Sequence, residues 1–229
     1  MITYSAMEFP TRVLLLAVWI CWGGSFCLGQ TSAHEFRLGR MVENDGWESV
    51  SQSKILSATA RGALTKAVAG VGAKSEQELQ QTAAHTRIKA IDLGGKGGEE
   101  FLAQGFGVQS CSPTGNCETW VLRQNGDNYS VILHRGAAQT FTIQPTVTNS
   151  LHDIVLGMHG SATMQGLTLY RFDGTKYRRA GCYVENFTMI GKDGGVQNLD
   201  EPRITPCSKL PRKQASATAV PSTAVTIAP

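Results

Sequence analysis

The chain has 229 residues, of which 41% are hydrophobic and 17% are charged, and 21 basic against 18 acidic residues leave a net charge of +3. This length suits one domain or two, and no basic run is as long as a typical nucleic-acid-binding arm. A coiled coil, an acidic disordered tail and a polytopic membrane protein all fit this composition poorly. We therefore expect no nucleic-acid partner.

An apolar run near the N-terminus predicts export. Residues 13–22 read VLLLAVWICW, follow Arg12, and precede several small residues. A helix of about ten residues is only about 15 Å long, half the hydrocarbon core of a bilayer, which is the length of the apolar region in a signal peptide. We expect a signal peptide over residues 1–33, cleaved after Gly29 or Ala33, with an uncleaved N-terminal anchor as the alternative. The protein would then be secreted or periplasmic in a bacterium, with no membrane span after signal removal.

Residues 34–86 are expected to form a helical N-terminal segment. Apolar residues with helical spacing are Leu56, Ala60, Ala63, Ala67 and Val71. They predict one weakly amphipathic helix that Gly70 and Gly72 end. Ser75 followed by Glu78 has the spacing of a capping box and predicts a second short helix that runs to about Thr86.

Residues 87–207 predict an antiparallel β-domain with an internal repeat. VLRQNGDNY (121–129) aligns with LYRFDGTKY (169–177) at an offset of 48, and EEFLAQG (99–105) resembles HDIVLGM (152–158) at an offset of 53. Each copy carries an Asn-Gly or Asp-Gly pair, which is a strong signal for a β-hairpin turn. The predicted fold class is therefore α+β: short N-terminal helices followed by a β-domain of two blade-like hairpin units.

The loop before the first unit supports a family resemblance. The pattern D-x3-K-G-x2-E, from Asp92 to Glu100, is followed by a buried-strand pattern and resembles the start of an FG-GAP or integrin-type repeat, over about residues 88–187. In that family the loop binds calcium through carboxylates. Gly94 and Lys96 occupy two positions that should be acidic or amide, so we expect a loop without metal. The alternative is that calcium binds and orders this loop. Because two units cannot close a propeller, we expect a twisted sheet or small sandwich covered by the helices.

The cysteines predict disulfide bonds. Two of the six leave with the signal peptide, and the mature chain keeps Cys111, Cys117, Cys182 and Cys207. An even number in an oxidising compartment favours disulfides, for which three pairings exist. The loop between Cys111 and Cys117 is rich in turn-forming residues and brings the two within bridging range, which leaves Cys182 with Cys207. A zinc site is the alternative, although it would require tighter spacing.

No pattern for a serine nucleophile or a phosphate-binding loop is present, and we expect no cofactor and no catalytic residue. The first hypothesis is an exported, non-catalytic binding or interaction module of the cell envelope, whose partner is an unknown protein or glycan. The alternative is an envelope hydrolase that acts on glycans through a carboxylate pair. The carboxylates available for such a pair are Glu99, Glu100, Asp153 and Asp173.

Aromatic and arginine residues concentrate in the β-domain and suit contacts with proteins or carbohydrates. The candidate binding residues are Trp120, Arg123, His159, Tyr170 and Arg171. The loops over residues 111–117 and 159–166 are the expected contact surface. Residues 208–229 contain no aromatic or acidic residue, and they predict a disordered tail.

Overall fold

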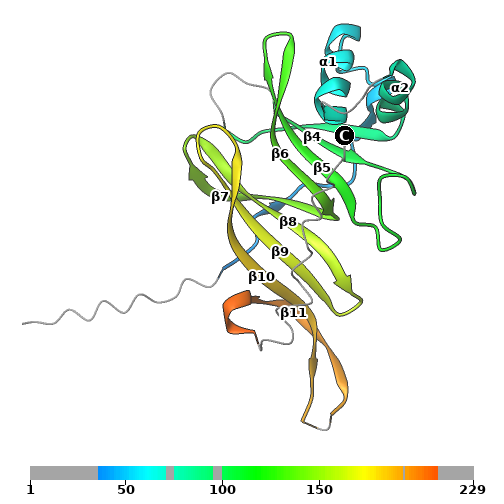
Figure 1. Cartoon of the computed structure of the whole chain (residues 1–229). Coiled ribbons are helices and arrows are strands. Elements are labelled where there is room, and N and C mark those ends of the chain that lie inside the picture. Colours follow the sequence, from blue (N-terminus) through cyan, green and yellow to red (C-terminus); the bar gives the residue numbers. More distant parts are fainter. Residues whose placement is uncertain (1–35, 71–74, 95–99, 193, 211–229) are drawn as a thin grey trace, which may run out of the picture. The chain divides into compact units, whose positions relative to one another are not determined.

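The computed structural model describes residues 36–70, 75–94, 100–192 and 194–210, and over these residues the chain forms two antiparallel β-sheets and two α-helices (Figure 1). The predominance of antiparallel strands and the two helices agree with the sequence prediction. The predicted signal peptide and residues 211–229 of the predicted tail lie outside the described residues. Within the described ranges, no helix is long and apolar enough to cross a membrane.

In both sheets neighbouring strands run antiparallel, and apart from β1, which lies beside β7, the strands of each sheet follow one another in chain order. The order of the first sheet is β2-β3-β4-β5-β6, and that of the second sheet is β1-β7-β8-β9-β10-β11. The strands of the first sheet are β2 (Glu48–Ser49), β3 (Thr86–Ile91), β4 (Glu100–Gly105), β5 (Cys117–Asn125) and β6 (Asn128–Ala138). Those of the second sheet are β1 (Arg40–Met41), β7 (Thr140–Thr148), β8 (Leu151–Ser161), β9 (Met164–Phe172), β10 (Tyr177–Ile190) and β11 (Val196–Pro206).

The two predicted helices are present, but the second ends at Ala84, before the predicted end near Thr86, because Thr86 begins strand β3. Helix α1 (Ala58–Ala69) begins after Ser57, whose side chain accepts a hydrogen bond from a main-chain N–H of the first turn. Helix α2 (Glu76–Ala84) begins with the complete capping box of Ser75 and Glu78. These bonds satisfy N–H groups that have no partner inside a helix, which is why the two helix starts can be recognised from local sequence.

Two short strands precede the helices, whereas the sequence predicted a helical segment over residues 34–86. Strand β1 pairs with β7, opposite Ile143, and β2 pairs with β3. Gly39, just before β1, lies directly against the main-chain carbonyl of Ile143, where a β-carbon would collide. Each of these strands has two residues, so no alternation of polar and apolar side chains could reveal it.

Both hairpin turns predicted from Asn-Gly and Asp-Gly are present, but they differ in length. In the β5–β6 hairpin, Asn125 pairs with Asn128, and Gly126 adopts a φ of 60° in the two-residue loop. In the β9–β10 hairpin, Phe172 pairs with Tyr177, so the loop has four residues. Positive φ at the first loop position explains the glycine in the shorter turn.

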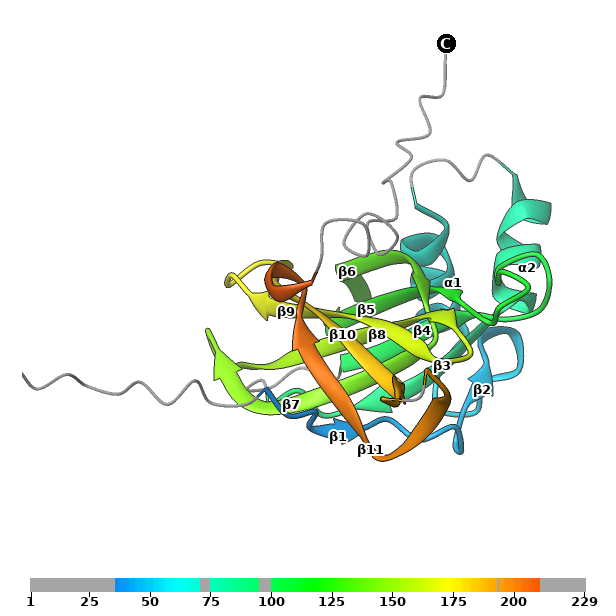
Figure 2. The same ribbon diagram turned by 90° about the horizontal axis from the view of Figure 1, so that it is seen from below.

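The main core lies between the two sheets. Leu102 and Val121 of the first sheet belong to the same buried cluster as Ile154 and Tyr170 of the second sheet. Helix α1 covers the opposite face of the first sheet (Figure 2). Leu64 and Val68 of α1 pack there with Phe101, Trp120 and Leu122. The opposite face of the second sheet carries Val155, Leu167 and Leu169, and the N-terminal residues Phe36 and Leu38 pack there. Each sheet therefore has two buried faces.

Two disulfide bonds join Cys111 to Cys117 and Cys182 to Cys207, as the sequence predicted. The first joins two cysteines that are six positions apart in the sequence and whose Cα atoms lie 4.0 Å apart. The second spans 25 residues and fastens β10 to the segment that follows β11. The disulfides therefore fix the edge of one loop and the C-terminal end of the described chain.

Candidate functional site

Two of the five candidate binding residues, Trp120 and Tyr170, lie in the interior. Each is only 6% exposed. The Trp120 ring stacks on His134 at a centroid distance of 5.1 Å. Burial raises the pKa of Tyr170, and the positive charges of Arg135 and Arg179 partly offset this shift. The rings of Trp120 and Tyr170 therefore contribute mainly to packing, with Tyr170 close to two cations.

Two further candidates, Arg123 and Arg171, pair with buried carboxylates. Arg123 donates two hydrogen bonds to Oε1 of Glu100, at 3.1 and 3.0 Å. Arg171 donates one to Oδ2 of Asp153 at 3.3 Å. The carboxylate side chains of both pairs are 2% exposed, whereas Arg171 is 56% exposed and Arg123 is 25% exposed. These contacts give both arginines a partner inside the protein.

The two buried carboxylates lie near the same tyrosine. The hydroxyl group of Tyr177 donates a hydrogen bond of 2.6 Å to the main-chain oxygen of His152. Burial raises the pKa of Tyr177, and the negative charges of Glu100 and Asp153 raise it further. Because both carboxylates are buried and paired with arginine, a glycan does not have access to them in this conformation.

The remaining described carboxylate of the proposed hydrolytic set, Asp173, lies in the β9–β10 turn. It accepts main-chain hydrogen bonds from Lys176 and Thr175, and its other oxygen accepts one of 2.7 Å from Arg178. The bond from Lys176 is the largest cause of a pKa lowered to about 2, followed by those from Arg178 and Thr175. A carboxyl group with so low a pKa is ionised at neutral pH and does not serve as a general acid.

The last candidate, His159, contacts the loop between Cys111 and Cys117, which we call the disulfide-closed loop. The side chain of Asn116 donates a hydrogen bond of 3.1 Å to the main-chain oxygen of His159 and accepts one of 2.8 Å from its main-chain N–H. The structure thus joins the predicted 111–117 loop to strand β8, whereas the predicted 159–166 loop is wrong, because only residues 162–163 of it lie outside β8 and β9. An open hollow of about 390 Å³ lies on the disulfide-closed loop, with Val108 and Pro113 in its wall. Val108 is 95% exposed.

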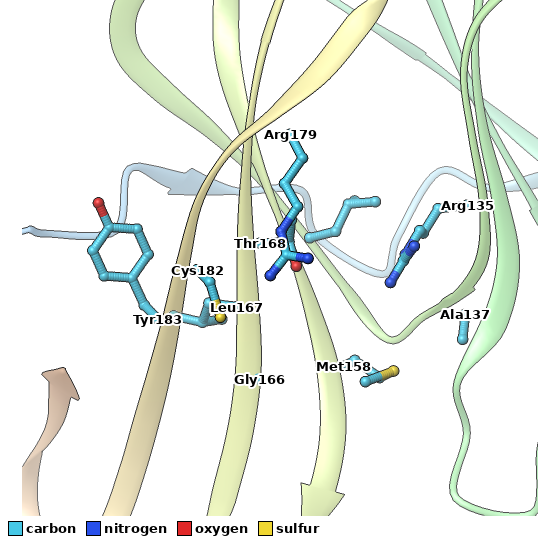
Figure 3. Close-up of a pocket in the computed structure, with 10 residues that line it drawn as sticks. Arg135, Ala137, Met158, Gly166, Leu167, Thr168, Arg179, Cys182 and Tyr183 are labelled. Carbon is cyan, nitrogen blue, oxygen red and sulfur yellow. The ribbon is translucent and has the colours of Figure 1, made fainter. Parts of the chain in front are cut away.

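A second, smaller pocket of about 80 Å³ lies between strand β6 and strands β8–β10, and its lining includes two arginines. Arg135 and Ala137 come from β6, and Arg179 comes from β10. Figure 3 shows the guanidinium groups of Arg135 and Arg179 pointing into the space over Thr168 of β9. We call this the arginine pocket. None of the five residues proposed from the sequence lines it.

The sequence offered only part of the signal for the arginine pocket. Arg179 belongs to the cluster of aromatic and arginine residues in the β-domain, but Arg135 lies in a different sheet. The two meet because the sheets pack face to face, and no spacing in the sequence encodes that contact. The sequence also did not predict that Arg123 and Arg171 pair with Glu100 and Asp153, although the predicted repeat aligns both arginines and both acidic residues.

The loop from Asp92 to Glu100 is described only at its ends, because residues 95–99 lie outside the described ranges. Asp92 accepts a hydrogen bond of 2.7 Å from the main-chain N–H of Gly94, and Glu100 faces Arg123. Among the described residues, no group of three or more histidine, cysteine or acidic side chains is arranged to hold a metal ion.

We predict that calcium does not stabilise the protein. Since Glu100 is paired with Arg123, a calcium ion at this loop would have to break a buried ion pair to gain that ligand. Thermal unfolding in excess calcium and in excess chelator should therefore give the same Tm. A Tm several degrees higher with calcium would contradict this prediction, because a ligand that binds the folded state raises its stability.

Comparisons with known proteins give no relatives: no family model, no curated protein and no solved structure matches this chain.

Proposed function

We propose that the protein is an exported, non-catalytic binding module of the cell envelope, and that the disulfide-closed loop forms its contact surface. The observation that carries this proposal is the double hydrogen bond between Asn116 and the main chain of His159. It fixes the loop that precedes β5 against strand β8 of the other sheet. A surface that is rigid before binding loses less conformational entropy when a partner attaches.

The chemistry of the loop suits a protein or a glycan. Val108, Pro113 and two glycines give the hollow an apolar wall, and the hydroxyl groups of Ser112 and Thr114 lie beside it. The exposed Val108 has no structural need to be apolar, since it is 95% accessible to solvent. Export is supported by the two disulfides, which persist in oxidising compartments.

The scaffold in this proposal consists of two blade-like copies of one unit, as the resemblance to FG-GAP repeats suggests. Phe101 of β4 pairs with Leu122 of β5. Ile154 lies 53 residues after Phe101, Tyr170 lies 48 residues after Leu122, and these two residues also pair with each other. The two offsets seen in the sequence therefore match the pairing of β4 with β5 to the pairing of β8 with β9. The salt bridge between Glu100 and Arg123 corresponds to that between Asp153 and Arg171 in the same way.

The packing of the two sheets also supports a repeat. The face of the first sheet with Leu102 and Val121 packs on the second sheet, whereas the matching face with Val155 and Leu169 is covered by N-terminal residues. Corresponding faces therefore point the same way along the stack, as in consecutive propeller blades. This is a head-to-tail arrangement, in which α1 covers one end.

The alternative, a hydrolase acting on glycans, has one observation in its favour. Burial raises the pKa of Glu185, as a general acid requires. However, Glu185 is absent from the walls of the arginine pocket and of the hollow at the disulfide-closed loop. Glu100 and Asp153 are buried in salt bridges, and Asp173 has a lowered pKa. The binding module therefore agrees better with the described side chains.

The proposal is tested by capture from an envelope extract with the oxidised full chain immobilised. We expect one species to be held by the wild type and lost from Asn116→Ala, because the substitution frees the loop from His159 and leaves both disulfides intact. Asn128→Ala, in the exposed β5–β6 hairpin, is the matched control and should retain the species. Equal capture by both variants, or no capture by the wild type, would contradict the proposal.

A further inference from the structure

The arginine pocket differs from the other arginine sites of the β-domain in its charge balance. Arg123, Arg171 and Arg178 each form a salt bridge with a carboxylate. Arg135 and Arg179 form none with any residue that the structure describes, and no acidic residue is in the pocket lining. Two positive charges from two different sheets thus face one small space without a negative charge.

The two positive charges repel each other when the pocket contains only water. Arg135 is half-buried and Arg179 is exposed, and Leu156 and Leu167 form apolar parts of the wall. Like charges near one another repel, and an apolar wall weakens the screening by solvent. The fold gains nothing evident from holding both guanidinium groups there, whereas a bound anion would reverse the repulsion into attraction.

The size of the pocket limits what binds. A volume of about 80 Å³ holds several water molecules but is well below the roughly 300–1,000 Å³ of a pocket for a whole drug-sized ligand. It suits one compact charged group. Each guanidinium presents planar, parallel N–H donors that fit two oxygens of an oxyanion, and the Thr168 hydroxyl is a further donor in the wall.

We propose that the arginine pocket is an anion-binding site for a phosphate group, either free or at the end of an envelope ligand. Two cations without an acidic neighbour match a doubly charged tetrahedral oxyanion better than a singly charged carboxylate. Arg135 and Arg179 bind its oxygens from opposite sheets, and Thr168 donates from the floor. The disulfide of Cys182, which lines the same pocket, fixes the β10 wall against the C-terminal segment.

This site is separate from the contact surface proposed above, since the arginine pocket shares no lining residue with the hollow at the disulfide-closed loop. The two proposals therefore fail independently. A protein that binds phosphate but captures no envelope species would retain only the anion site. A protein that captures a partner but binds no phosphate would retain only the binding module.

The test is isothermal titration of the oxidised full chain with inorganic phosphate, glycerol phosphate and acetate. Phosphate should bind more tightly than acetate. Glycerol phosphate should bind at least as well as phosphate if the natural ligand carries its phosphate as an ester, and more weakly if free phosphate is the ligand. Phosphate binding no tighter than acetate binding, or no binding at all, would overturn the proposal.

Substitutions locate the site. Arg135→Gln and Arg179→Gln should each weaken phosphate binding roughly tenfold or more, because each removes charge-assisted hydrogen bonds. Arg203→Gln, on the exposed part of β11, removes the same charge outside the pocket and should leave the Kd unchanged. Arg179→Lys keeps the charge but not the planar pair of donors, so we expect it to weaken phosphate binding less than Arg179→Gln does. Because this variant keeps the positive charge, it is also the less disruptive one for folding. Equal Kd values for wild type, Arg135→Gln and Arg179→Gln would refute this location.

Discussion

Replacement of Arg123 by alanine is expected to lower the free energy of unfolding by about 3–5 kcal/mol. The substitution leaves Glu100, whose side chain is 2% exposed, without the two hydrogen bonds that it accepts from the guanidinium group. A buried carboxylate without a partner keeps its desolvation cost and loses the compensating attraction. The loss of packing over the Phe172 ring, 5.4 Å from the guanidinium carbon, adds to the effect. Denaturant unfolding monitored by fluorescence measures the change.

Two further variants separate the charge effect from general damage. The double substitution Glu100→Leu with Arg123→Met removes both charges and should recover most of the lost stability, since apolar replacements of buried ion pairs are often neutral or stabilising. Arg171→Ala should cost clearly less than Arg123→Ala. Arg171 is 56% exposed, and Asp153 keeps a hydrogen bond of 2.9 Å from Thr146. A double variant no more stable than Arg123→Ala would show that packing, and not an unpaired charge, determines the loss.

Removal of the disulfide between Cys182 and Cys207 is expected to cost about 3 kcal/mol. This bond closes a loop with a sequence separation of 25, and a cross-link of that length restricts the unfolded chain considerably. It also holds the segment after β11 against β10. The replacement Cys182→Ala with Cys207→Ala tests the effect without leaving a free thiol, and thermal and denaturant unfolding give its size.

The disulfide between Cys111 and Cys117 is the matched control. Its sequence separation is only 6, so its removal should cost less, about 2 kcal/mol, and its main effect should be on the capture of a partner. A greater loss of stability from the shorter loop than from the longer one would contradict this ranking. It would then follow that the loop contributes to folding through contacts such as that between Asn116 and His159.

The features that could be predicted from the sequence are local ones. The start of α2 depends on Ser75 and Glu78, three residues apart, and the β5–β6 turn depends on Gly126. The disulfide pairing followed from one turn-rich loop and from elimination. In each case the residues that determine the structure lie close together in the chain, so their spacing carries the information.

The features that could not be predicted depend on contacts between distant segments. Trp120 and Tyr170 have the residue type of binding surfaces, but the layers on both sides of each sheet bury them. Strand β1 exists because β7 offers an edge about a hundred residues later. Arg135 and Arg179 meet only after the two sheets pack, and their shared pocket has no trace in the order of the residues.

The strand order of the two sheets has a consequence for the sequence of folding events. From β2 to β6 in the first sheet and from β7 to β11 in the second, each strand pairs with the next strand in the chain, so most pairings close short loops, at low entropic cost. Strand β1 is the exception, because Arg40 pairs with Ile143. During synthesis from the N-terminus, residues 36–41 are made before the rest of the described chain, yet β1 gains its partner only after β7 has been made. We therefore expect β1 to become ordered only after β7.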